Sequence, residues 1–478
     1  MSSNLGSMFG GTAAGMGVAS ACMQIQASLS NNTLMPYDVA FEAAAQANWA
    51  SNARQTPVCI VQPSSAQDLQ QVITILDQQD APFAIRSGGH NPAPGFSNID
   101  DGVLVDLAKL TGLHFDGDKS VAVVGTGNRW GDVYDYLDQF GVTVAGGRTA
   151  NVGVGGFTLG YLYGLVCDNV VDYEIVLADG SIVHANADAH DDLYWALKGG
   201  ASNFGVVTSF TFTTYPIGEL WGGVKVYAWD DLSGLLSAMH EYQSAPNKDP
   251  YANTYLQGFP NNRKLGLILS MVYLKHDANA AAFEPFNKFT PLLDTTGFKS
   301  MGQLASSYPQ PTVARVDWQV TSYKPSRPVT EKLGDLLQNA PALVSLPNIA
   351  AGSGAFGLQP ISTSAIEQGR ARGGNALGLA AVNQTWLHID VGWGLAEDDE
   401  TARGMPRSII DELEHAARAE DAYLPYQFMN DASFEQDVIG HYGSANVERL
   451  REIEAKYDPN HRLKALLPGG FKIPQAEK

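Results

Sequence analysis

Three glycine-containing loops within 75 residues form the part of the sequence best suited to bind a ligand. Residues 85–91 are a strand that runs into a Gly-Gly pair, residues 124–133 hold a Gly-x-Gly turn before a helix, and residues 146–160 hold two more Gly-Gly pairs. Glycines let backbone N–H groups approach an anion closely. Three such loops predict one extended, phosphate-bearing ligand held by backbone amides.

A single histidine, His90, follows the first Gly-Gly pair and can point into the space above that loop. Without other information, such a histidine is more often an ordinary loop residue than a catalytic group. The chain has no Gly-x-x-x-x-Gly-Lys-Ser/Thr motif, and no Gly-x-Gly-x-x-Gly fingerprint opens a βαβ unit near its start. A nucleotide triphosphatase and a standard Rossmann protein are therefore disfavoured.

A second group of chemically capable residues lies on strands expected in the C-terminal half. In residues 386–391, Trp386, His388 and Asp390 alternate with apolar residues and so share one face of a strand. The same alternation gathers two further sets, Tyr251, Asn253, Tyr255 and Gln257 on one strand, and Arg315, Asp317, Gln319 and Thr321 on another. Such a polar face is either solvent-exposed surface or part of a substrate site.

The elements that must position these residues change in character near residue 216. Before it, short β-runs alternate with helices expected at 65–79 and 129–139; after it come longer strands at 251–257, 265–274, 314–321 and 385–391, with helices at 229–246, 399–418 and 444–456. This order predicts an α+β protein whose second lobe is an antiparallel sheet covered by helices on one face.

Composition limits the possible partners. The chain has 478 residues, enough for two or three lobes, and its net charge of −20 would repel nucleic acid. No apolar run reaches the roughly 18 residues that cross a bilayer. Neither nucleic acid nor a membrane is therefore expected as a partner, and no metal site is predicted.

Residues 86–90, Arg-Ser-Gly-Gly-His, resemble the flavin-attachment motif of FAD-linked oxidases with the vanillyl-alcohol-oxidase-type, or PCMH-type, FAD-binding fold. Over nearly the whole chain from Cys22, the sequence resembles the fungal berberine-bridge-enzyme-like oxidases. Further segments that carry this resemblance are 165–170, 191–200, 203–208, 358–361, 373–379 and 456–472. The resemblance implies an N-terminal segment at 1–56, an FAD-binding domain at 57–217, a substrate domain at 218–424 and a C-terminal segment at 425–478 that returns to the FAD domain.

The resemblance also implies FAD attached by a covalent bond from His90 to the 8α-methyl group of the flavin. Many relatives add a second bond from a cysteine; Thr149 stands at that position here and cannot form the thioether, so a single link is expected. The expected cofactor-binding set is Arg86, Ser87, Gly88, Gly89, His90, Asn91, Gly125, Gly127, Gly147, Thr149, Val152, Gly153, Gly155, Gly156, Thr158, Gly160, Gly164, Asn169, Gly205, Val206, Val207 and Asn430.

A tyrosine pair that is typical of the family is missing. The family's Tyr-x-Asn-Tyr motif, whose first tyrosine is often assigned to substrate deprotonation, corresponds here to Phe428, Asn430 and Asp431. On a strand, Asn430 and Asp431 would point to opposite faces, so Asp431 is either a replacement base or a solvated carboxylate. Because the family's polar sheet face lies over the flavin, the expected bases are His388, then Tyr255, then Asp390, with Asp431 last.

The activity implied is hydride transfer from a small organic substrate to flavin, with O2 reduced to H2O2. A redox-neutral isomerase or cyclase is the alternative, and a flavin carrier without catalysis is a third possibility. The sequence defines neither the substrate nor the oligomeric state.

The cysteines bear on localisation. Spacing alone leaves a Cys22–Cys59 bridge and three free thiols equally open, whereas secreted fungal members of the family carry a cysteine pair at these places, which implies the bridge. Cys167 lies in an apolar stretch and is expected to be a core thiol. Residues 18–21 resemble a signal-peptide cleavage site, although no basic residue precedes Arg54. A secretory location is expected.

Overall fold

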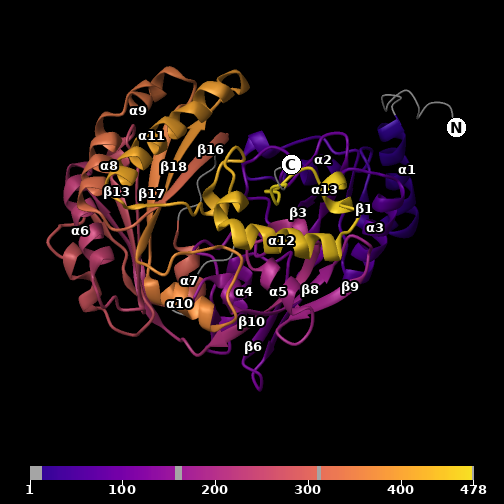
Figure 1. The fold of residues 1–478 in the computed structure, drawn as a ribbon, viewed down its shortest axis with the longest axis horizontal. Coiled ribbons are helices and arrows are strands. Elements are labelled where there is room, and N and C mark those ends of the chain that lie inside the picture. Colours follow the sequence, from indigo (N-terminus) through magenta and orange to yellow (C-terminus); the bar gives the residue numbers. More distant parts are fainter. Residues whose placement is uncertain (1–12, 157–163, 309–313, 476–478) are drawn as a thin grey trace.

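The computed structural model describes residues 13–156, 164–308 and 314–475 and has two lobes (Figure 1). The first lobe holds two sheets. One has the strand order β1-β2-β4-β3, in which β2, β4 and β3 are parallel; the other has the order β5-β6-β10-β8-β9, with β7 beside β10. The strands are β1 Thr33–Leu34, β2 Cys59–Val61, β3 Phe83–Arg86, β4 Val103–Asp106, β5 Leu113–Asp116, β6 Val121–Gly125, β7 Thr143–Val144, β8 Val170–Val176, β9 Ile182–Asn186 and β10 Val206–Tyr215.

Capping residues and the spacing of apolar residues explain where helices form in the first lobe. α3 (Ala66–Gln78) begins after Ser65, whose side chain accepts a hydrogen bond from the backbone N–H of Asp68. Leu69, Val72 and Leu76 recur every three or four residues and are fully buried. The lobe also contains α1 (Ala13–Ser28), α2 (Phe41–Ala45), α4 (Trp130–Asp138) and α5 (Asp191–Leu197). The helices predicted at 65–79 and 129–139 are confirmed.

The second lobe is built on a nine-stranded sheet whose pairings are all antiparallel. Its order is β14-β11-β13-β12-β17-β18-β16-β19, with β15 beside β11. The strands are β11 Leu220–Tyr227, β12 Ala252–Gly258, β13 Leu267–Tyr273, β14 Leu293–Asp294, β15 Gly297–Lys299, β16 Arg315–Tyr323, β17 Ser353–Ile361, β18 Gln384–Trp393 and β19 Tyr423–Leu424. The α+β fold with an antiparallel second sheet is confirmed.

Helices cover one face of this sheet, which we call the outer face (Figure 1). They are α6 (Leu232–Ser244), α8 (Arg327–Asn339), α9 (Pro341–Ser345) and α11 (Asp399–Ala419). Leu256, Leu387 and Ile389 bury their side chains under them. The opposite, inner face meets the first lobe, because Arg148 of that lobe donates a hydrogen bond to Gln359 of β17. The remaining helices are α7 (Met301–Ser306) and α10 (Thr363–Ala371).

The polar set on β16 lies on the outer face and not over the flavin-binding lobe. Gln319 is opposite Ile389 in the register, so both share the helix-covered face. Arg315 pairs with Asp399 of α11 at 2.6 Å, and Thr321 Oγ1 donates to a carboxylate of the same helix at 2.9 Å. The alternation of polar and apolar residues correctly predicted that these four residues share one face of β16. It did not predict which face, because the two-residue period of a strand does not show which side of the sheet the helices cover.

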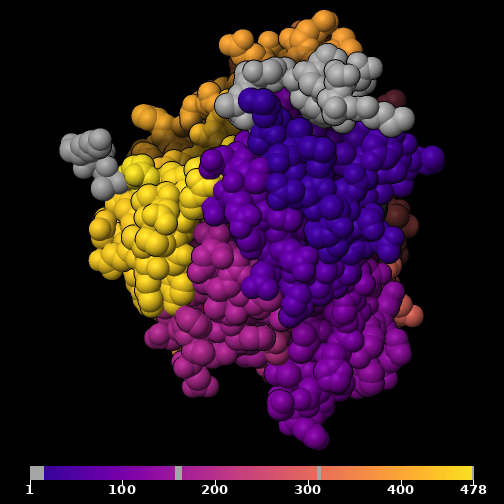
Figure 2. Space-filling view, turned by 90° about the vertical axis from the view of Figure 1, so that its right-hand side faces the viewer, coloured from indigo at the N-terminus to yellow at the C-terminus, as the bar shows by residue number. Residues whose placement is uncertain are grey.

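The C-terminal segment lies against the first lobe. Its helices are α12 (Ser444–Tyr457) and α13 (Arg462–Leu466). Lys456 pairs with Asp192 of α5 at 2.5 Å, and Arg462 pairs with Asp77 of α3 at 2.5 Å. Figure 2 shows this segment, in yellow, packed on the surface of the first lobe. No helix in the described part of the chain has the length and hydropathy that a bilayer span requires.

A disulfide joins Cys22 of α1 to Cys59 of β2, 37 residues apart, and Cys167 is a buried free thiol. The pairing implied by the family resemblance is thus confirmed. Burial raises the pKa of the Cys167 thiol well above its usual value, and the charge of Asp168 raises it further. Cys167 is therefore unreactive at neutral pH.

We expect thiol titration under denaturing, non-reducing conditions to find one free thiol, that of Cys167. Replacing both Cys22 and Cys59 by serine should lower the free energy of unfolding by about 3–4 kcal/mol, because the bridge closes a loop of intermediate length. Urea denaturation measures this change, with Cys167→Ser as the control for losing a sulfur atom outside the bridge. Three titratable thiols in the wild type would contradict the pairing.

Candidate active site

The glycine loops of the first lobe converge, as the sequence predicts. A Cβ added to Gly88 would lie 2.5 Å from the backbone nitrogen of Gly153, so the first and third loops touch through their backbones. Ser87 Oγ joins the second loop by donating to the Thr126 carbonyl at 2.7 Å and accepts from the N–H of Gly155 at 3.3 Å. Only glycine permits the contact between Gly88 and Gly153.

Two further contacts brace this cradle. Arg129 donates to the carbonyl oxygen of Gly88 at 3.3 Å, and the side-chain amide of Asn430 donates to the carbonyl oxygen of Gly156. An added Cβ at Gly156 would meet nothing within 4 Å. In the same loop, Asn151 Oδ1 is buried without a hydrogen-bond partner among the described residues. The closely packed glycine backbones and the unpaired acceptor Asn151 Oδ1 are compatible with a bound FAD.

Other members of the expected cofactor set have a structural role in this fold. Arg86 forms a buried ion pair with Asp106 at 3.0 Å and donates to Asn48, so its guanidinium is already paired within the protein. Asn169 is fully buried and its Oδ1 accepts from Tyr215 and Arg372. Gly125, Gly127, Gly147 and Gly205 each have a backbone or ring atom where a Cβ would sit. Close packing alone therefore explains why these four positions are glycine.

The rest of that set occupies loops and core strands near the cradle. Asn91 Oδ1 caps its own turn by accepting from the N–H of Ala93 at 2.8 Å. The backbone oxygen of Val207 accepts from Thr126 Oγ1 at 2.8 Å. Gly89, Thr149 and Val152 lie in the first and third loops, Val206 is in the core and Gly164 packs on Asp168. Thr158 and Gly160 lie outside the described residues.

His90 is half-buried and stacks on the indole of Trp49, with ring centroids 4.4 Å apart and planes inclined by 13°. Burial, and then the positive charge of Arg129, lower the pKa of His90 to about 4. Its imidazole is therefore neutral at physiological pH. Trp49 belongs to the N-terminal segment, and its contact with His90 is not visible in the sequence.

A hydrogen-bonded row crosses the inner face of the large sheet. Tyr255 Oη of β12 lies 2.8 Å from His388 Nε2 of β18, although β17 runs between these strands. The two side chains meet above Gly357 of β17, where an added Cβ would overlap both of them. The missing side chain at Gly357 is thus the local reason that the two groups can touch.

Asp390 extends the row on the same strand face. Its Oδ1 lies 3.1 Å from His388 Nδ1, close enough for an ion pair. Burial lowers the pKa of His388, but the nearby Tyr255, Asp390 and Asp431 outweigh burial and raise this pKa well above the usual value. His388 therefore holds a proton at neutral pH.

Asp431 lies within electrostatic range of the same histidine, contrary to the strand argument. Met429–Asp431 is a short 3-10 helix, so strand alternation does not apply there. Burial raises the pKa of Asp431, while the charges of His388 and Arg148 oppose that shift. Asp431 and Asn430 can consequently both approach the site.

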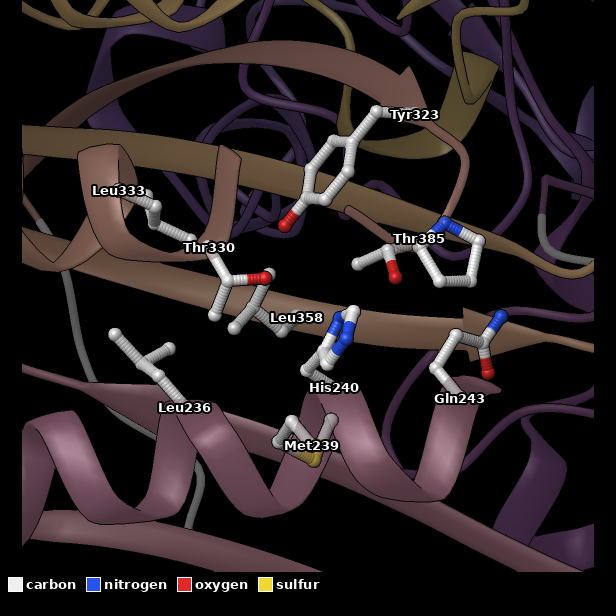
Figure 3. Close-up of a pocket in the computed structure, with 10 residues that line it drawn as sticks. Leu236, Met239, His240, Gln243, Tyr323, Thr330, Leu333, Leu358 and Thr385 are labelled. Carbon is white, nitrogen blue, oxygen red and sulfur yellow. The ribbon is translucent and has the colours of Figure 1, made fainter. Parts of the chain in front are cut away.

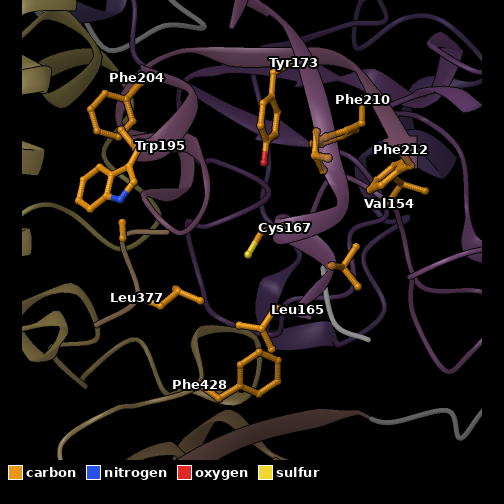
Figure 4. Close-up of a cluster of buried hydrophobic side chains, with 14 of the residues drawn as sticks. Val154, Leu165, Cys167, Tyr173, Trp195, Phe204, Phe210, Phe212, Leu377 and Phe428 are labelled. Carbon is orange, nitrogen blue, oxygen red and sulfur yellow. The ribbon is translucent and has the colours of Figure 1, made fainter. Parts of the chain in front are cut away.

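Phe428, which replaces the first motif tyrosine, is packed as an apolar side chain. It stacks on Trp386 with centroids 5.0 Å apart and planes inclined by 26°. Figure 4 shows Phe428 beside Leu165 in the cluster that also buries Cys167. A proton-transfer role at position 428 is absent because its surroundings, like its side chain, are hydrophobic.

Aromatic rings connect the two halves of the site. Trp49 lies 6.2 Å from Trp318 of β16, and Trp318 lies 6.4 Å from His388, measured between ring centroids. Trp318 occupies the inner face because it is opposite Asp390 in the register. The sequence analysis did not identify four residues of this site: Trp49, Trp318, Gly357 and Arg148. Of these, Trp318 could have been found from the alternation of β16, because it lies on the strand face opposite to the polar set.

The cavities on the outer face are separate from these residues. One of about 20 Å³ lies between α6 and the sheet, lined by Met239, His240 and Leu358 among others, and Figure 3 shows His240 pointing toward Leu358. A neighbouring cavity of about 420 Å³ lies between α6 and α8. Helix-covered residues line both, so neither contains the groups of the inner face.

Sequence comparison gives a consistent family. The FAD binding domain family matches residues 57–186. An FAD-dependent monooxygenase of Arthrobotrys oligospora is 34% identical over 465 residues, which are 94% of this chain and 89% of that protein. The bifunctional solanapyrone synthase of Alternaria solani is 32% identical over 482 residues, covering 96% of this chain and 90% of that protein.

Solved structures share the fold at lower identity. The xylooligosaccharide oxidase of Myceliophthora thermophila aligns with a TM-score of 0.76 and 19% identity, covering 96% of this chain and all of that one, 100%. The BBE-like 1 protein of Physcomitrella patens aligns with a TM-score of 0.75 and 18% identity over 96% and 100%. The chain therefore belongs to the family of FAD-linked oxidoreductases that includes these fungal relatives, it has the fold of the berberine-bridge-enzyme-like, PCMH-type proteins, and it is an FAD-dependent enzyme.

Proposed function

We propose that this enzyme is an oxidase that removes a hydride from a small alcohol, amine or secondary-metabolite intermediate and reduces O2 to H2O2. The observation that carries the proposal is the row of Tyr255, His388 and Asp390, a chain of proton-accepting groups on the inner sheet face. Bound FAD supplies the hydride acceptor. Formation of one H2O2 per O2 consumed tests the oxidase against the monooxygenase activity for which several relatives are named.

His90 is the group that links the cofactor in this proposal, through a single 8α-histidyl bond. A nucleophile needs a free lone pair, and the lowered pKa of about 4 keeps the imidazole neutral at physiological pH. The stacked indole of Trp49 holds the ring in one orientation. Thr149 offers no thiol for a second link.

The proton of the substrate hydroxyl passes to Tyr255 Oη as the hydride leaves. Above the raised pKa of His388, where its imidazole is neutral, Tyr255 gives its own hydroxyl proton to His388 Nε2, 2.8 Å away. Asp390, beside Nδ1, stabilises the imidazolium that forms. This order makes Tyr255 the group nearest the substrate and His388 the proton acceptor behind it, whereas the sequence ranked His388 before Tyr255.

A redox-neutral isomerase or cyclase is the second candidate, and the raised pKa of His388 favours it. A protonated His388 can support Tyr255 as a proton donor to a substrate oxygen. One relative is named a bifunctional solanapyrone synthase. Anaerobic mixing separates the two functions: bleaching of the visible flavin absorbance identifies the oxidase, and product without bleaching identifies the isomerase.

Folding in the secretory pathway is part of the proposal, because disulfides such as Cys22–Cys59 form in oxidising compartments. The partners are then a small-molecule substrate and O2.

The His90→Ala variant should fold and bind FAD without a covalent bond. After acid precipitation, the yellow colour should remain with the wild-type pellet and move to the supernatant for the variant. His114→Ala, an exposed histidine of the same lobe, is the control and should keep its colour in the pellet. Colour that stays with the His90→Ala pellet would place the link elsewhere.

Tyr255→Phe and His388→Gln should slow anaerobic flavin reduction by about 10²–10⁴-fold, the usual contribution of a general base. Because the relay works only with neutral His388, whose pKa is raised, the wild-type rate should rise with pH above the range of an ordinary histidine. Asp390→Asn removes a charge that holds this proton, so the rising limb should move to lower pH. Stopped-flow absorbance across a pH series measures both effects.

Two results would count against this relay. One is unchanged reduction in all three variants. The other is loss of reduction in Asp431→Asn alone, which would move the base to the C-terminal segment.

Gly357→Ala should slow flavin reduction as strongly as Tyr255→Phe, although every ionisable group remains. The added methyl group occupies the place where Tyr255 and His388 meet. Gly297→Ala, in another strand of the sheet with only Lys299 Nζ at 3.8 Å, is the matched control and should retain the wild-type rate. Wild-type rates in Gly357→Ala would show that the hydrogen bond is not required.

A further inference from the structure

The side-chain amide of Gln359, on β17, has a hydrogen-bond partner at its oxygen but none among the described residues at its nitrogen. Its Oε1 accepts a hydrogen bond from Arg148 Nη1 at 2.7 Å. Its Nε2 is buried and lacks a hydrogen-bond partner among the described residues, and the whole residue is 3% exposed. A buried N–H without an acceptor is destabilising, so a bound molecule that brings an acceptor would remove this penalty.

The register places this amide beside the proposed proton relay. Gly357, above which Tyr255 and His388 meet, lies two residues before Gln359 and therefore on the same face of β17. Trp386 is opposite Gln359 on β18 and stacks on Phe428. The amide thus lies between the relay and an apolar aromatic wall.

Arg148 makes the unpartnered N–H a stronger donor. Its guanidinium lies over the ring of Tyr255, 4.0 Å from the ring centroid, while it donates to Gln359 Oε1. A cationic donor at the amide oxygen draws electron density from the amide nitrogen, and linked hydrogen bonds strengthen one another. Arg148 therefore acts through Gln359 as a positioning residue.

A comparison within the sheet shows why the face matters. Gln319 of β16 is also buried with an Nε2 that lacks a partner among the described residues. It lies on the outer face opposite Ile389, under the helices, where it cannot reach the relay. Gln319 is therefore a matched control for a buried, unpartnered amide.

We propose, resting on the oxidase function above, that Gln359 Nε2 donates a hydrogen bond to a carbonyl oxygen of the substrate. The substrate is then a hydroxy-carbonyl compound whose hydroxyl reaches Tyr255 while its carbonyl reaches Gln359. Residues two apart on a strand are separated by about 7 Å, so the two oxygens stand a few bonds apart in the substrate. The aromatic wall of Trp386 and Phe428 accommodates its apolar part.

Binding of 4-phenylbutan-2-one, a ketone without an oxidisable hydroxyl, tests the donor on its own. The probe is titrated into the FAD-loaded protein and followed by the visible flavin spectrum. Gln359→Glu keeps an oxygen for Arg148 but loses the N–H, and should raise the Kd by about tenfold or more, as expected for losing a buried hydrogen bond. Gln319→Glu should leave the Kd close to wild type. Gln359→Met gives the same comparison if Gln359→Glu does not retain flavin.

A second pair of probes links the donor to the reaction. Wild type should reduce its flavin about tenfold faster with 4-hydroxy-4-phenylbutan-2-one than with 1-phenylbutan-1-ol at equal low concentration, and Gln359→Glu should lose this preference. Equal ketone binding by wild type and Gln359→Glu, or no binding to wild type, overturns the inference. Ketone binding that depends on Gln359 while neither alcohol reduces the flavin supports the inference and contradicts the oxidase proposal.

Discussion

Burial of the outer sheet face under α6, α8 and α11 is the constraint on which the rest of the structure depends. Leu256, Leu387 and Ile389 are removed from water on that side, and strand geometry then forces their neighbours to the other side. Tyr255, His388 and Asp390 are consequently presented together on the inner face. The groups of the proposed relay are positioned by a hydrophobic contact that contains none of them.

The inner face combines groups whose titrations depend on one another. Tyr255, Asp390 and Asp431 outweigh the effect of burial and raise the pKa of His388, whereas burial and Arg129 lower the pKa of His90. The two histidines are thus held in opposite protonation states at neutral pH. A neutral imidazole suits attachment to a cofactor, and a readily protonated one suits storage of a proton. The two lobes thus give the same residue type opposite pKa shifts.

Small residues are as important here as reactive ones. Gly88 and Gly153 bring two loops into backbone contact, and Gly357 lets two side chains from strands on either side of it form a hydrogen bond. In each case a Cβ would occupy space that the site requires. Phe428 shows the converse, since an aromatic ring without a hydroxyl fills the position of a family tyrosine and joins the apolar packing.

The sequence by itself determined the fold class, the family, the converging glycine loops and the strand alternation that groups His388 with Asp390, because these depend on local pattern and on motifs. The family resemblance, with Thr149 at the position of the second link, likewise led to the expectation of a single covalent bond. Tertiary structure decided which face of β16 turns inward, and it made Met429–Asp431 a 3-10 turn where a strand was expected. It also brought Trp49 to His90 and Tyr255 to His388, pairs that are 41 and 133 residues apart. Periodicity fixes which residues share a face, but only long-range packing decides what that face meets.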